Sequence, residues 1–245
     1  MSTPFTPELL HAIHAASDRQ PLLFGNARII TADPLIGDFA PGDLLLGGDR
    51  IVGIGPGLLT AADDDGALVI DCSGFTIVPL VLDLAQPLRP AGYRPPTAIA
   101  PGNPASFAIL PTVAEEVVQT FRADPAAAVA VVIDGEARSW GGRPVEATAP
   151  ADGEGAGPAT PAAGSAAEIP ESRLGTWIDE NGFVHQHLTA DGRYDETRGG
   201  REHAYQGTYW INGNRIDYRD DLGFWAFGEF SGDTLLHAGY TFHRA

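Results

Sequence analysis

Two histidines separated by one residue are the clearest candidates for metal chemistry in the sequence. His185 and His187 flank Gln186, and in an extended strand they lie on one face, a spacing that suits two ligands of one metal ion. Further ligands would have to come from the remaining C-terminal histidines, His203, His237 and His243. No cysteine or acidic motif completes a recognisable set, so we interpret the two as a surface pair and expect no metal site.

Acid–base chemistry without a metal or cofactor is a second option. A buried Asp, His or Tyr in a closed barrel can act as a general acid or base in a cyclisation or isomerisation. The candidates for this role are Asp217, Asp220, His185 and Tyr209. The alternative is that the aspartates are solvated loop charges beside neighbouring arginines, and the sequence leaves both readings open.

Aromatic side chains gather in the last third of the chain, where they could line a ligand site. Tyrosine and tryptophan combine an apolar ring with one polar group, which suits a ring-containing organic ligand. Alternation along a strand puts Tyr205 and Tyr209 on one face and Trp210 on the other, without showing which face is inside. These rings could equally fill the core of a small domain. The candidate ligand-binding residues are Trp177, Tyr194, Tyr205, Tyr209, Tyr218, Trp225 and Tyr240.

Composition excludes several classes of function. The formal net charge of −17 opposes binding to nucleic acid or to anionic membranes. All 15 basic residues are arginine, which excludes Schiff-base catalysis and a P-loop lysine. The single cysteine, Cys72, lies in an apolar strand and suits a reducing compartment as a small buried hydrophobe. With no signal-peptide pattern and no membrane-spanning apolar run, we expect a cytoplasmic protein.

The pattern of the first 147 residues predicts one short helix followed by short strands. The N-terminal helix is expected over residues 7–19, with Thr6 as its cap and Pro7 in its first turn. A second helix is expected over residues 114–121. Apolar, often β-branched runs between Gly and Asp turns predict strands. These strands are expected at 22–31, 43–46, 50–54, 68–72, 75–78, 106–110, 129–133 and 137–140.

Beyond a tract rich in Pro, Ala and Gly, the pattern predicts a small antiparallel barrel. Residues 148–170 are expected to be a flexible linker. Seven or eight short strands follow, separated by the turn pairs Asn181-Gly182, Asp191-Gly192, Asn212-Gly213 and Gly232-Asp233. Short strands joined by tight turns are typical of an up-and-down barrel. The expected organisation is a helix over 1–19, a domain over 20–147, the linker, and a barrel over 171–245.

The segment from residue 69 to residue 87 resembles the amidohydrolase superfamily. Its D-C-S-G turn at 71–74 and the run P-L-V-L-D-L-A-Q-P at 79–87 follow that family's D-x-x-G and P-G-x-x-D-x-H-x-H motifs. Ala85 and Pro87 stand where the two metal-binding histidines would be. Segments 100–110, 131–135 and 142–145 are similar to the family's closing strands. The resemblance implies an amidohydrolase-type β-sandwich over 20–147 from which the catalytic barrel and metal ligands are missing.

The C-terminal part resembles a streptavidin-like, calycin-type family of unassigned function. The motifs that carry the likeness are G-T-W at 175–177, D-G-R-Y at 191–194 and Y-Q-G-T-Y-W at 205–210. This resemblance implies a barrel able to hold one small molecule.

We therefore expect a mainly β protein that binds a ring-containing or apolar organic molecule in its C-terminal barrel, with a structural N-terminal sandwich and no cofactor. A cofactor-free cyclase or isomerase using the same cavity is the alternative. A non-catalytic assembly or scaffold protein is the second alternative. The expected partner is a small organic ligand, and the sequence leaves a homo-oligomer open.

Overall fold

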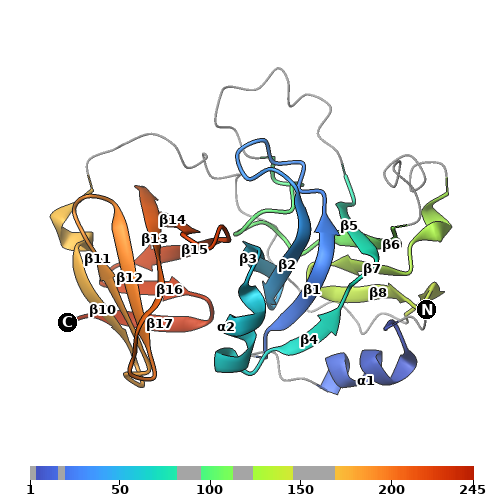
Figure 1. Ribbon diagram of the computed structural model, residues 1–245, viewed down its shortest axis with the longest axis horizontal. Coiled ribbons are helices and arrows are strands. Elements are labelled where there is room, and N and C mark those ends of the chain that lie inside the picture. The colour runs from blue at the N-terminus through green and yellow to red at the C-terminus, as the bar shows by residue number, and fades with distance from the viewer. Residues whose placement is uncertain (1–3, 16–19, 82–94, 113–123, 146–168) are drawn as a thin grey trace. The chain divides into compact units, whose positions relative to one another are not determined.

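The protein is mainly β and contains a closed barrel of eight antiparallel strands, as predicted (Figure 1). The computed structural model describes residues 4–15, 20–81, 95–112, 124–145 and 169–245. Its contacts divide the chain into two compact units, Met1–Thr160 and Pro161–Ala245. Residues 148–168 of the expected linker lie outside the described residues, so the linker stays a prediction. Among the residues described, no helix is long and apolar enough to cross a membrane.

The first unit is built outward from one central strand. Strand β1 pairs antiparallel with β2, while its two halves pair in parallel with β4 and then β5. The ladder continues from β2 to β3 on one side and from β5 through β6, β7 and β8 to β9 on the other. The elements are α1 (Pro7–Ala15), β1 (Leu22–Ile29), β2 (Phe39–Gly47), β3 (Arg50–Gly55), α2 (Leu58–Asp65), β4 (Leu68–Asp71), β5 (Phe75–Pro79), β6 (Phe107–Pro111), the 3₁₀ turn η2 (Pro125–Ala127), β7 (Ala130–Ile133), β8 (Glu136–Trp140) and β9 (Arg143–Pro144).

Buried aliphatic and aromatic side chains of β1, β2, β5 and β6 form the core of this unit. Phe24 and Phe107 are fully buried and meet edge to face, with their ring centroids 5.3 Å apart. Cys72 is buried as well, and burial raises the pKa of its thiol, which keeps the sulfur protonated. Its environment is that of a small hydrophobic side chain, as its position in an apolar strand predicted.

The sequence missed α2, because a distant carboxylate starts this helix. Both oxygens of the buried Asp43 accept backbone N–H groups, Oδ1 from Asn26 at 2.9 Å and Oδ2 from Leu58 at 3.0 Å. The second bond satisfies an N–H group of the first turn of α2, the role that a local N-cap residue usually has. No N-cap residue precedes Leu58 in the sequence, so the sequence contains no local signal for the start of this helix.

Other boundaries also differ from those expected. Helix α1 is described only as far as Ala15, and β2 begins at Phe39, four residues before the expected start. The expected helix at 114–121 lies outside the described residues. The same holds for Ala85 and Pro87, so the altered metal motif is not placed by the structure.

The second unit is an up-and-down barrel in which each strand pairs with the next. Strand β17 pairs with β10, for example Ile178 opposite His243, and this pairing closes the barrel. The elements are the 3₁₀ turn η3 (Glu171–Arg173), β10 (Gly175–Asp179), β11 (Val184–Leu188), β12 (Arg193–Arg198), β13 (Arg201–Asn212), β14 (Arg215–Asp220), β15 (Trp225–Ser231), β16 (Thr234–His237) and β17 (Tyr240–Arg244).

The four Gly-containing pairs predicted as turns do connect strands, and three further turns complete the barrel. Gly199-Gly200 joins β12 to β13, and residues 221–224 join β14 to β15. Residues 234–244 follow the pattern of a single strand in the sequence, and Ala238-Gly239 divides them into β16 and β17. Ala238 has a φ of 50°, a left-handed conformation that alanine rarely adopts. Because alanine is a weak turn signal at such a position, the sequence did not separate the last two strands.

Gly207 gives a test of how closely the barrel interior is packed. A Cβ atom at this position would lie 2.2 Å from the Arg219 carbonyl oxygen and 2.7 Å from Cε1 of Tyr194. We expect Gly207→Ala to lower the free energy of unfolding by about 2–3 kcal/mol, because backbone atoms would have to move. Urea denaturation of the variant measures the loss. Thr208→Ser, one residue along on the other face, is the control and should cost less than about 0.5 kcal/mol. Equal stability of both variants would contradict the close packing.

Candidate functional site

The candidate site is the inside of the C-terminal barrel, whose lining is fixed by strand register. Paired residues in neighbouring strands share a face, and alternate residues along a strand share a face. Tyr194 pairs with Gly207, and Tyr209 with Tyr218, in positions that are buried on the inner side. From these pairs the period of two assigns the inner face of every strand. The polar residues on it are Asp179, Gln186, Glu196, Arg198, Asp220 and His237.

A hydrogen-bonded network of charged and neutral groups occupies the middle of this interior. Glu196 accepts from Nε of Arg198 at 2.5 Å and from Nε2 of Gln186 at 3.1 Å. Oε1 of Gln186 accepts from the hydroxyl of Tyr218 at 2.7 Å. Exposed fractions are 2% for Glu196, 6% for Arg198 and 0% for Gln186. Two opposite charges therefore lie inside the barrel in contact with each other, and their hydrogen bonds offset part of the cost of removing them from water.

Two tyrosine rings flank the arginine of this network. The guanidinium carbon of Arg198 lies 5.2 Å from the ring centroid of Tyr205 and 5.6 Å from that of Tyr240. Both distances fall within the range of cation–π attraction, which is stronger away from water. The rings and the carboxylate of Glu196 together hold the guanidinium in one place and orientation.

One end of the barrel carries most of these groups. In an up-and-down barrel, β12 and β14 end where β13, β15 and β17 begin, so Arg198, Asp220 and Tyr240 lie at the same end. We call this the Arg198 end, and it carries the turns 180–183, 199–200, 221–224 and 238–239. Tyr240 is half-buried and Leu222 is exposed there, whereas Tyr205 and Phe224 are buried. The Arg198 end thus has exposed and half-buried residues at its rim and a buried charged group, Arg198, further inside.

Asp220 and Tyr194 form a second polar pair near this end. The hydroxyl of Tyr194 donates to Oδ2 of Asp220 at 2.7 Å, and the backbone N–H of Leu222 donates to Oδ1 at 2.7 Å. Burial raises the pKa of Asp220, although both hydrogen bonds oppose that shift. Burial and the nearby Asp220 raise the pKa of Tyr194, so this hydroxyl remains protonated. The pair can exchange a proton only with a partner that reaches into the barrel.

Six of the seven predicted ligand-binding aromatics lie on inner positions, and Trp225 does not. Trp225 pairs with Arg219 on the outer face and stacks on Trp210, with ring centroids 5.8 Å apart and an angle of 17° between the ring planes. Alternation along the sequence does not show which face Trp225 lies on, because no tight-turn pair in the sequence fixes the register between β14 and β15. The six inner residues are Trp177, Tyr194, Tyr205, Tyr209, Tyr218 and Tyr240.

The four catalytic candidates are divided between the two faces of the barrel wall. Asp220 and Tyr209 point inward, and the Tyr209 hydroxyl donates to the carbonyl oxygen of Thr189 at 2.7 Å. Asp217 points outward and pairs with Arg215 through an Nη2–Oδ1 distance of 2.6 Å. His185 also points outward, with its ring 3.1 Å from the carbonyl oxygen of Gly182. The structure therefore does not bring these four side chains into one site.

The histidine pair is placed on the outer surface, as interpreted from the sequence. His187 lies 3.0 Å from the hydroxyl of Thr176, and His203 lies 2.6 Å from Oδ2 of Asp195. Within the part of the chain that is described, no group of three or more His, Cys, Asp or Glu side chains is arranged to hold a metal ion. His237 points inward instead, beside the ring of Tyr218.

Sequence reasoning missed the network of Gln186, Glu196 and Arg198. A signal was present, because Glu196 and Arg198 follow Tyr194 at intervals of two and must share its face. Once Tyr194 is assigned to the lining, both charged residues are assigned with it. Gln186 carries no such signal, because its two neighbours in the sequence, His185 and His187, lie on the opposite face of β11.

Comparison with known proteins gives a family for the barrel. Residues 170–244 match the family model described as Agrobacterium tumefaciens protein Atu4866. The solution structure of protein Atu4866 from Agrobacterium tumefaciens is 45% identical to this chain over 31% of this chain and 98% of that one, with a TM-score of 0.29. Residues 170–244 belong to the Atu4866 family. No curated protein matches the chain.

The ion pair inside the C-terminal barrel gives a direct test of the barrel's energetics. We expect Glu196→Gln to lower the free energy of unfolding by about 3 kcal/mol, because Arg198 would remain buried without its counter-charge. The double variant Glu196→Gln/Arg198→Met should lose less than the sum of the two single variants, by at least about 1.5 kcal/mol. A double-mutant cycle from urea denaturation measures this coupling. Additive losses would show that the two charges do not depend on each other.

Asp220 gives a test with a defined dependence on pH. Because burial raises its folded-state pKa, Asp220 contributes stability that is fully present below the unfolded pKa and is lost as the pH rises through the folded pKa. The stability gap between wild type and Asp220→Asn should therefore shrink from about pH 3 to about pH 6.

Its neighbour Asp221 is the control. A hydrogen bond from Arg193 lowers the pKa of Asp221, so its contribution is present above the unfolded pKa and is lost as the pH falls. The gap for Asp221→Asn should accordingly widen over the same rise in pH. Denaturation midpoints of both variants, measured across this pH range, give the change of each stability gap with pH. A change in the same direction for both variants would contradict the opposite environments of Asp220 and Asp221.

Proposed function

We propose that the C-terminal barrel binds a small organic molecule that contains a ring, at the Arg198 end of its interior. The observation that carries the proposal is the buried pair of Glu196 and Arg198, with the arginine flanked by Tyr205 and Tyr240. Replacing a buried ion pair by packed apolar residues is often neutral or stabilising. Stability of the fold alone therefore gives little reason for Glu196 and Arg198 to be buried. Ordered charge beside aromatic rings is the usual make-up of a small-molecule site.

The rest of the Arg198 end supports the same class of ligand. The half-buried ring of Tyr240 offers flat apolar surface, and the buried rings of Tyr205 and Phe224, which meet edge to face at 5.6 Å, lie at the same end. Arginine donors favour a carbonyl or carboxylate acceptor on the ligand. The streptavidin-like resemblance of residues 171–245 agrees with a binding barrel. The proposed ligand is thus a ring with one oxygen acceptor.

For the N-terminal unit we propose a structural role. The resemblance to an amidohydrolase-type sandwich without its catalytic barrel supports this role, as do Ala85 and Pro87 at the positions of the metal ligands. In this account residues 20–147 carry no hydrolase chemistry, and the ligand-binding part of the protein is the C-terminal barrel, in a cytoplasmic protein.

A cofactor-free enzyme, of the cyclase or isomerase type, is the second candidate. The observation that favours it is the raised pKa of Asp220 beside the hydroxyl of Tyr194, because perturbed carboxyl groups recur at sites of acid–base catalysis. The same carboxyl group also accepts the Leu222 N–H of its turn, which gives it a structural function. Binding therefore has the stronger support.

Ligand-observed NMR with a library of ring-containing fragments tests the proposal on the full chain. Fragments with a carbonyl or carboxylate should bind wild type, and Tyr240→Ser should weaken binding about tenfold through loss of one stacking surface. Trp210→Ser on the outer face is the matched control and should leave binding unchanged. Loss of binding in the control alone, or no binding to wild type, would contradict the proposed site. Fragments recovered unchanged support binding, and a new product supports the enzyme alternative.

A further inference from the structure

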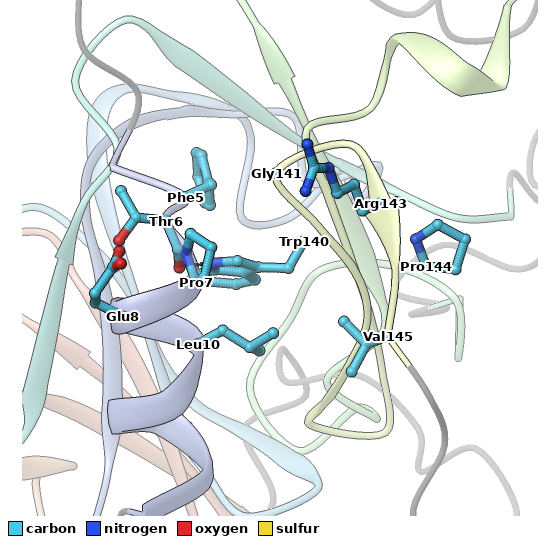
Figure 2. A pocket seen from close by; sticks show the side chains of 10 residues that line it. All are labelled: Phe5, Thr6, Pro7, Glu8, Leu10, Trp140, Gly141, Arg143, Pro144 and Val145. Atoms are coloured by element: carbon cyan, nitrogen blue, oxygen red, sulfur yellow. Dashed lines mark hydrogen bonds between the residues drawn. The ribbon is translucent and has the colours of Figure 1, made fainter.

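The pocket between α1 and the β8–β9 turn has the size of a small-molecule site but offers little that would select a ligand (Figure 2). Its volume of about 620 Å³ falls in the range of roughly 300–1,000 Å³ for such sites. Its two rings are covered by the protein itself, because Phe5 is 2% exposed and Trp140 is 4% exposed. Nε1 of Trp140 also donates to the carbonyl oxygen of Thr6 at 2.9 Å, so its polar edge is engaged. The charged groups at the Arg198 end of the barrel define a ligand more closely.

Buried carboxyl groups outnumber buried guanidinium groups at the Arg198 end. Arg198 is 6% exposed, and its Nε donates to Glu196, so this pair is neutral as a whole. Asp179 ends β10 and Asp220 ends β14, which places both at the same end, and each is 4% exposed. Arg201 follows the 199–200 turn and is exposed, so water and salt screen its charge. Among the buried groups described at this end, two carboxyl groups therefore remain without an arginine of their own.

Both carboxyl groups are held in place by donors that carry no charge. Oδ1 of Asp179 accepts the backbone N–H of Val184 at 2.6 Å. Asp220 accepts the Tyr194 hydroxyl and the Leu222 N–H, each at 2.7 Å. These bonds fix the two groups without cancelling their charge. Burial raises the pKa of Asp220 even so, because this part of the interior opposes a negative charge.

The balance of charge disfavours an anionic ligand beside Arg198. A carboxylate placed there would compete with Glu196 for the guanidinium and would share this end with Asp179 and Asp220. Repulsion between like charges is stronger inside a protein than in water, because the effective dielectric constant is lower. A cation would be repelled by Arg198, whose hydrogen bonds need an acceptor. An uncharged carbonyl oxygen accepts from a guanidinium without adding charge, so it fits this end best.

We propose, on the basis of the binding function given above for the barrel, that the Arg198 end selects an uncharged aromatic carbonyl compound, such as an aryl amide or ketone, over an aromatic carboxylate or cation. The ring lies against Tyr240, which is half-buried at the rim, and the carbonyl oxygen accepts from Arg198. Glu196 sets the preference by neutralising Arg198, and Asp179 and Asp220 reinforce it.

Three probes of the same shape and different charge test the preference on the full chain. They are benzamide, benzoate and benzamidinium, titrated by ligand-observed NMR at about pH 8, where a histidine of ordinary pKa is neutral. Benzamide should bind about tenfold more tightly than either ion. Benzoate or benzamidinium bound as tightly as benzamide, and weakened by Tyr240→Ser, would overturn the charge preference and leave the ring site standing. Binding of none of the three at millimolar concentration would overturn the binding function itself.

Two neighbouring aspartates show whether buried carboxyl groups cause the preference. Asp220→Asn removes one buried charge and keeps an acceptor for Tyr194 or Leu222, so it should reduce the ratio of benzamide to benzoate affinity about threefold. Asp221→Asn removes the same charge from an exposed side chain that pairs with Arg193 at an Nη2–Oδ2 distance of 2.6 Å, and it should leave the ratio unchanged. Circular dichroism of both variants checks that the fold is kept. An equal ratio in both variants would overturn the assignment of the preference to buried charge.

Discussion

Closure of the C-terminal barrel by the pairing of β10 with β17 is the constraint on which the rest of that unit depends. The pairing removes both edges of the sheet and divides every strand into an inner and an outer face. After closure, Gln186, Glu196 and Arg198 have no access to solvent from their strands and must find partners among inner residues. Their hydrogen bonds, and those of Tyr218 and Tyr194, are consequences of that enclosure.

Enclosure also explains why the interior is chemically uneven. Near Trp177 and Phe230 the lining is aromatic, with ring centroids 5.3 Å apart, whereas the Arg198 end combines opposite charges with tyrosine hydroxyls. A core selected for packing alone would not need the charged groups of the Arg198 end, because burying a charge costs desolvation energy and burying an apolar side chain does not. The asymmetry is therefore the main physical reason why we propose ligand binding at one end of the barrel.

How much the sequence could predict depended on whether the signal was local. The barrel was predictable, because Asn181-Gly182 and similar pairs mark turns through their own conformational preferences. Helix α2 was not, because Asp43 caps it from another strand. The residues on the inner face of the barrel could be identified only once the strand register was known. In the sequence Trp225 and Tyr218 are equivalent candidates for the lining, but the pairing of Trp225 with Arg219 puts Trp225 on the outer face. The ion pair was within reach through the spacing from Tyr194, but a period of two does not say that charged residues will be enclosed.

The chain contains a barrel of the Atu4866 family and an N-terminal unit with a separate pocket beside Trp140. We propose that the Arg198 end of the barrel holds a ring-containing ligand. A crystal structure of the full chain grown with a carbonyl-bearing aromatic fragment tests this most directly. We expect electron density for the fragment between Tyr240 and Arg198, with an oxygen within hydrogen-bonding distance of the guanidinium. Fragment density confined to the outer face of the barrel, with an unchanged interior, would contradict it.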